Sequence, residues 1–223
     1  MFAGHVGVAL AVGRAERRIN VGILMLAALL LDVILWLFVL LGWESVAIPA
    51  DFARTHQAEF AFPYSHGLLA GMAWSVLAGA IVFAAMPRRD AHRLRAAALV
   101  GAGVLSHWLL DALVHVAELP LAGPGSMKVG LGLWQHMAPA LGVETLIVAA
   151  GLWLFVPGAG LSRAKAVSLT ILTLVTLGVT IAGMTIAPPP PSAMAMAASS
   201  LATIALLCIL AGWLGKAPRE KSG

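Results

Sequence analysis

Charged residues are scarce in this sequence: Asp, Glu, Lys and Arg make up 11% of its 223 residues, whereas hydrophobic residues make up 61%. A soluble domain carries about 25% charged residues and could not keep such an apolar surface in water. The single cysteine, Cys208, excludes a disulfide framework. The sequence has no P-loop, no GxSxG element and no c-type haem attachment motif. The mean hydropathy of +0.94 indicates an integral membrane protein.

The apolar residues fall into blocks of about 20, long enough for an α-helix to cross the hydrocarbon core of a bilayer. Only helices satisfy their own backbone hydrogen bonds there. We therefore expect an all-α polytopic transmembrane helix bundle of six long helices, at about 21–42, 66–86, 96–117, 129–156, 166–187 and 193–215, with a kink at Pro139. The shorter stretch 2–13 predicts a short N-terminal membrane helix. The chain reads as a single integral membrane domain over 1–223, with metal-site helices in 1–117 and further transmembrane helices in 129–215.

Basic residues occupy alternate connections between these blocks, as the positive-inside rule requires. The net charge of +4 is therefore explained by topology, and we expect no nucleic-acid partner; the partner is the lipid bilayer. The pattern predicts the bacterial inner membrane with the C-terminus in the cytoplasm. Because basic residues follow the stretch 2–13 rather than precede it, we expect no cleaved secretory signal. The basic residues are Arg14, Arg17 and Arg18; Arg88, Arg89, Arg93 and Arg95; Arg163 and Lys165; and Lys216, Arg219 and Lys221.

Several ionisable residues lie inside the apolar blocks, where each costs on the order of 2.5–3.5 kcal/mol on insertion scales and needs a partner or a purpose. Asp32 interrupts an apolar run, and His107 and Asp111 are four residues apart, so they share one helix face. His66 and His136 fall at compatible depths on two other helices. Imidazole with carboxylate suits zinc or another divalent transition metal, although a His–Asp pair can also join helices as a hydrogen-bonded staple.

At these residues the sequence resembles the YdjM-like family of membrane-bound metal-dependent hydrolases. The likeness covers about the first 115 residues. Its elements are a histidine before small residues, an aspartate closing an apolar helix, a step like Thr-His-Ser-Leu, and a Gly…Ser-His…Asp helix. They correspond to Gly4-His5-Val6-Gly7, Asp32, Ser65-His66-Gly67-Leu68 and the run from Gly103 through Ser106-His107 to Asp111.

The resemblance implies a membrane-embedded hydrolase that uses a divalent metal, zinc first, on a phosphoryl or acyl ester of a lipid or lipid-linked substrate. Asp32, His107 and Asp111 would be catalytic, and the metal ligands would be His5, Asp32, His66, His107, Asp111 and His136. The chain departs from the family pattern by having one aspartate around position 32 and Ala61-Phe62-Pro63 in place of a His-Arg-Gly step. One metal instead of two, recruitment of His136 or His115, and loss of catalysis are the alternatives, and Glu144 is available as a base.

Two other classes of function compete with a hydrolase. An ion or proton transporter or relay would use the same intramembrane Asp and His groups, although no inverted repeat is visible in the motifs. A non-enzymatic bundle with a structural metal or a haem held by two histidines is the other alternative.

Overall fold

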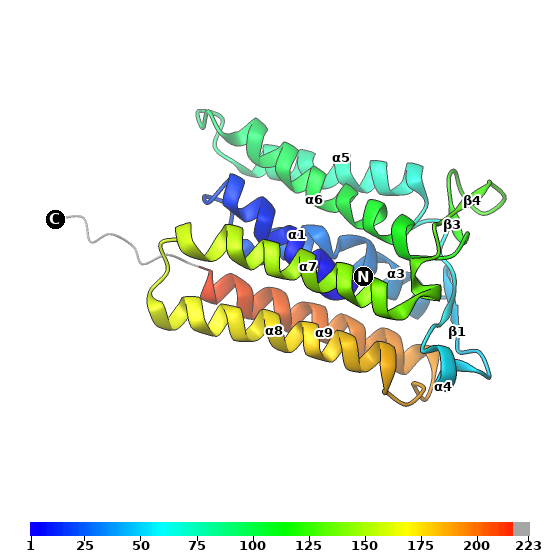
Figure 1. Cartoon of the computed structure of the whole chain (residues 1–223). Coiled ribbons are helices and arrows are strands. Elements are labelled where there is room, and N and C mark those ends of the chain that lie inside the picture. The colour runs from blue at the N-terminus through cyan, green and yellow to red at the C-terminus, as the bar shows by residue number, and fades with distance from the viewer. Residues whose placement is uncertain (216–223) are drawn as a thin grey trace.

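The computed structural model describes residues 1–215, most of them in helices that run along one common direction (Figure 1). The helices are α1 (Phe2–Ala15), α2 (Val21–Ala28), α3 (Leu30–Leu41), α4 (Phe52–Thr55), α5 (Leu68–Ala85), α6 (Arg93–Val114), α7 (Met137–Phe155), α8 (Arg163–Thr185) and α9 (Ala193–Leu214), with 3-10 turns η1 (Leu133–Gln135) and η2 (Val156–Gly158). Two short antiparallel pairs, β1 (Ser45–Ala47) with β2 (Glu59–Ala61) and β3 (Leu119–Pro120) with β4 (Lys128–Val129), are the strands. The expected all-α class is confirmed.

Five helices are long and apolar enough to cross a membrane: α5, α6, α8, α9 and α7 extended through η2. The first expected span, 21–42, is not one helix. It breaks at Leu29 into α2 and α3, whose axes are bent by 57°. The fourth is shorter than expected: α7 begins at Met137. Pro139 thus lies in the first turn of α7, where its missing N–H is not needed, and the expected kink at Pro139 was wrong.

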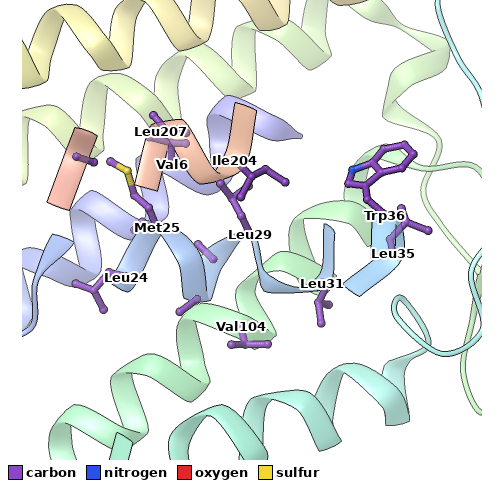
Figure 2. Packing of buried hydrophobic residues seen from close by; sticks show 14 of the residues in the cluster. Val6, Leu24, Met25, Leu29, Leu31, Leu35, Trp36, Val104, Ile204 and Leu207 are labelled. Atoms are coloured by element: carbon purple, nitrogen blue, oxygen red, sulfur yellow. The ribbon is translucent and has the colours of Figure 1, made fainter. Parts of the chain in front are cut away.

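The broken span lies in the centre of the apolar core. Leu24 and Leu31 lie between Val104 of α6 on one side and Ile204 and Leu207 of α9 on the other (Figure 2). All five of these side chains are buried. The core thus surrounds the break at Leu29, and the backbone groups that the break frees must find partners inside the protein.

Small residues let two helix pairs approach closely. Gly71, Ser75 and Gly79 are the buried residues of α5, and a Cβ added at Gly79 would come within 2.9 Å of the Ala97 carbonyl oxygen of α6. On α1, a Cβ added at Gly7 would meet the Ile147 carbonyl oxygen of α7 at 2.6 Å. Helix α1 is therefore seated directly against the backbone of α7, which fixes its position in the bundle.

The two ends of the bundle differ in charge and in structure. The basic end carries the α5–α6 turn and the α7–α8 turn, and there Arg18 pairs with Asp90 at 3.8 Å and Arg95 with Glu16 at 3.8 Å. The opposite end, the hairpin end, carries α4 and the strand pairs (Figure 1). Lys216, Arg219 and Lys221 lie outside the described residues. The arrangement is that of an integral membrane protein in which the α3–α5 and α6–α7 connections fold as a cap at the hairpin end.

Candidate metal centre

Five of the six predicted metal ligands meet in the half of the bundle nearer the hairpin end. Two groups of three could each hold a metal ion, and they share His107: His5 with Asp32 and His107, and His66 with His107 and Asp111. The four residues other than Asp32 are at most 2% exposed, so these groups are almost completely shielded from water. Segments far apart in the sequence supply them, namely the first turns of α1 and α3, the residues before α5 and the last turns of α6.

The break at Leu29 orients His107. In a continuous helix the Ala28 carbonyl oxygen accepts only from its own helix, but here it lies 2.7 Å from Nδ1 of His107. A carbonyl oxygen can only accept, so Nδ1 of His107 carries the ring proton and donates it to Ala28. The other ring nitrogen, Nε2, then faces the cluster with its lone pair, as a metal ligand requires.

A chain of hydrogen bonds through Ser65 orients His66. It begins at the carboxylate of Glu44, which the sequence analysis did not predict. Glu44 is buried in the connection after α3; its Oε1 accepts from the backbone N–H of Tyr64 and of Ser65, and its Oε2 accepts from the Ser65 hydroxyl at 2.7 Å. Because that hydroxyl has given its only proton to Glu44, its oxygen accepts from Nδ1 of His66, 2.8 Å away. Buried Trp108 also donates to the His66 carbonyl oxygen at 2.9 Å.

The consequence is that two lone pairs face one another. Nε2 of His66 and Nε2 of His107 are 3.2 Å apart, and neither carries a proton in its neutral form. Oδ2 of Asp111 lies 3.4 Å and 3.1 Å from these nitrogens. Oδ1 of Asp32 lies 3.7 Å and 3.6 Å from them. Four electron-pair donors crowd together in an apolar interior, an arrangement that could hold a metal ion.

The spacing and chemistry of these four donors fit a divalent metal. Ligands held about 2.0–2.1 Å from a tetrahedral zinc ion are roughly 3.3 Å from each other, close to the separations of 3.1–3.4 Å within the group of His66, His107 and Asp111. Two imidazoles and two carboxylates also bring two negative charges, which a divalent ion balances. Asp32 lies in the first turn of α3, where the positive end of the helix dipole stabilises its carboxylate.

His5 adds a fifth donor beside this set. Its ring stacks on His107 with centroids 3.8 Å apart, and its Nε2 lies 3.3 Å from Oδ1 of Asp111. The Met1 amino nitrogen is 3.4 Å from the same oxygen. Nδ1 of His5 is buried and has no hydrogen-bond partner among residues 1–215. Glu144 of α7 accepts from the Gly4 backbone N–H at 3.0 Å and so fixes the turn of α1 that carries His5.

The sixth predicted ligand, His136, is placed elsewhere. It is exposed after η1 at the hairpin end and belongs to neither ligand group of the described chain. The helix that was expected to bring it into the membrane begins only at Met137. His115 comes closer, because its Nε2 is 3.9 Å from Oδ2 of Asp111, but its Nδ1 is paired with Glu118. Phe62, at the departure from the family pattern, is fully buried against His66.

A cavity of about 370 Å³ adjoins the cluster and is lined by Asp32, His66 and Asp111. Asp32 is the most accessible of the three, with 20% of its side chain exposed. A molecule in the cavity can therefore reach the donor atoms from one side, while the protein interior closes the others.

Fold and site together define an integral membrane helical bundle with a buried His/Asp cluster able to hold a metal ion. Comparison of the chain with protein-family models, with curated proteins and with solved structures gives no match.

Proposed function

We propose that this protein is a membrane-embedded metal-dependent hydrolase that cleaves a phosphoryl or acyl ester of a lipid or lipid-linked substrate, as its resemblance to the YdjM-like family implies. The observation that carries the proposal is the pair of facing Nε2 atoms of His66 and His107, both beside Asp111 and both unprotonated in the neutral tautomers that their outer hydrogen bonds select. Zinc is the metal proposed, since the donors are imidazole and carboxylate at tetrahedral spacing.

Each residue of the cluster has a stated part in this proposal. His66, His107, Asp111 and Asp32 hold the metal, which when bound would lower the pKa of its water towards ~7 and polarise the ester. Asp32, the ligand most open to the cavity, faces the position of the ester. Glu144 also lines the cavity, and as a buried carboxylate it can accept a proton from the attacking water.

A proton relay is less well supported by the same structure. A relay needs ionisable groups that continue from the cluster to both ends of the bundle. Towards the basic end, α1 has no ionisable side chain between His5 and Arg14, and α6 has none between His107 and Arg95. Helix α2 has none at all. These three helices therefore offer no chain of ionisable groups that leads a proton from the cluster to the basic end.

The test is elemental analysis of the detergent-purified protein, with His107→Ala compared with His92→Ala. His92 lies on the α5–α6 turn at the basic end, so its replacement removes an imidazole far from the cluster. We expect about one equivalent of zinc in the wild type and in His92→Ala, and loss of the metal in folded His107→Ala. Wild-type protein that binds no metal when zinc is supplied would overturn the proposal.

Turnover separates a catalytic metal from a structural one. With phospholipid and lipid-phosphate esters as substrates, Asp32→Asn should abolish hydrolysis while the helical bundle persists in size-exclusion chromatography and circular dichroism. If Asp32→Asn instead leaves hydrolysis intact, or if metal-loaded wild type hydrolyses none of these esters, the hydrolase assignment fails.

A further inference from the structure

The cavity beside the cluster extends well beyond the metal-binding residues. From Asp32 and His66 it runs between the outer halves of α8 and α9, where Thr180 and Gly183 of α8 and Ser200 and Ile204 of α9 line it. No motif in this part of the sequence predicts chemistry, yet these two helices supply much of the cavity wall. Its volume of about 370 Å³ is at the lower end of the range of about 300–1,000 Å³ for small-ligand pockets.

The cavity opens sideways. Val179 lines it and is 62% exposed, and the lining residues Ser199 and Thr203 are exposed as well, so the cavity reaches the outer surface of the α8–α9 pair. Both helices are apolar membrane spans, which means that this surface faces lipid. Aromatic side chains also line the cavity, and Gln57, another lining residue, donates to the Trp134 carbonyl oxygen at 2.9 Å.

Three hydroxyl groups in the α8–α9 part of the wall are hydrogen-bonded to their own helix. Thr180 donates to the Thr176 carbonyl oxygen at 2.9 Å, and Thr203 donates to the Ser199 carbonyl oxygen at 2.8 Å. Ser199 in turn donates to the Met196 carbonyl oxygen at 3.0 Å. Hydroxyls that are bonded to their own helix present mainly carbon to the cavity, so the wall suits a hydrocarbon chain better than a sugar or a peptide.

We infer that the cavity binds the hydrocarbon chain of a single-chain bilayer amphiphile, which enters sideways between α8 and α9. The chain lies against Thr180, Gly183 and Ile204, and the ester at its head reaches the cluster at Asp32 and His66. The identity of the head group rests on the proposed function, whereas the chain site rests on the cavity, its apolar wall and its opening to lipid.

The experiment fills the cavity from α8. A Cβ added at Gly183 or at Gly178 has no heavy atom within 4 Å, so both positions accept a side chain, but only Gly183 lines the cavity. Gly183→Phe is compared with the matched control Gly178→Phe. The probe is 1-palmitoyl-lysophosphatidate, whose retention by the detergent-purified full chain is measured by native mass spectrometry. We expect one probe molecule per chain in the wild type and in Gly178→Phe, and at least tenfold weaker binding in Gly183→Phe.

Metal content and turnover keep this inference separate from the proposed function. If Gly183→Phe binds the probe as tightly as the wild type, or if Gly178→Phe weakens binding equally, the chain site is overturned, whatever the metal content. If binding depends on position 183 but the wild type takes up no zinc, the chain site stands and the hydrolase does not. If both stand, Gly183→Phe keeps its zinc and loses turnover of a palmitoyl ester, whereas Gly178→Phe keeps both.

Discussion

At the scale of single residues, the candidate metal centre depends on two ring nitrogens, Nε2 of His66 and Nε2 of His107, that carry no proton in the neutral side chains. His66 and His107 each donate a hydrogen bond from Nδ1 to an outer acceptor, the Ser65 hydroxyl oxygen and the Ala28 carbonyl oxygen respectively. Both outer acceptors are fixed by structure rather than by chance contact, the first through buried Glu44 and the second through the end of α2. Outer partners of this kind set the orientation and basicity of a metal-binding histidine.

Glu44 can be tested without touching any ligand. In Glu44→Gln the side-chain nitrogen cannot accept from the Ser65 hydroxyl, so Ser65 is freed to donate towards His66 and the ring loses its fixed orientation. We expect zinc affinity to fall about 10–100-fold, the usual effect of removing an outer partner. Chelator competition measures it. Glu59→Gln, which replaces an exposed carboxylate of the same connection, is the control. Equal zinc affinities in the two variants would contradict the role of Glu44 in orienting His66.

The sequence indicated five of the clustered residues because each is an ionisable group in an apolar block or at its edge. His5, Asp32, His66, His107 and Asp111 carry that signal, and the structure brings them together; their role as ligands stays a prediction. Glu44 gave no signal, since a carboxylate in a polar connection looks solvated, and only its contacts with Ser65 reveal its role. His136 was misplaced because the chain forms β4 and η1 where a continuous helix was expected.

At the scale of elements, the broken span and the close helix pairs position the cluster. Neither glycine nor proline marks the break at Leu29, so the residues 21–42 read as one helix, and their division into α2 and α3 could not be predicted from the sequence. The small-residue face of α5 is visible in the sequence, because glycine and serine repeat every four residues and leave room for a neighbouring helix. A repeat is visible in one chain, whereas a bend depends on the tertiary partners.

Gly151→Ala tests the close packing of α1 against α7. An added Cβ would collide with the backbone carbonyl of Gly7, two residues from His5, so α1 must shift away from α7. We expect a loss of about 1–3 kcal/mol in the free energy of unfolding, as for other overpacked interiors, together with weaker zinc binding. Thermal unfolding and metal titration measure the two effects. Gly178→Ala, where the added Cβ meets open space, should change neither, and a similar loss there would contradict the interpretation.

At the scale of the whole molecule, metal binding would be coupled to stability. The predicted ligands come from α1, α3, the segment before α5, and α6, so an ion bound to them would join elements distant in sequence. Ligand that binds only the folded chain at 100 times its Kd adds about 2.7 kcal/mol of stability. We expect zinc to raise the unfolding temperature of the wild type and a chelator to lower it. His107→Ala should show no shift with zinc, and a shift as large as that of the wild type would place the metal elsewhere.

The break at Leu29 also bears on how the chain enters the membrane during synthesis. Asp32 and the freed Ala28 carbonyl oxygen lie in the first third of the chain, but His107, their shared neighbour, belongs to α6. Until α6 emerges from the ribosome and is inserted, both groups would face hydrocarbon alone, where the aspartate costs on the order of 2.5–3.5 kcal/mol. We therefore expect the α2–α3 segment to reach its final bent conformation only after α6 has been inserted. Its assembly would then follow the translation of α6 rather than its own.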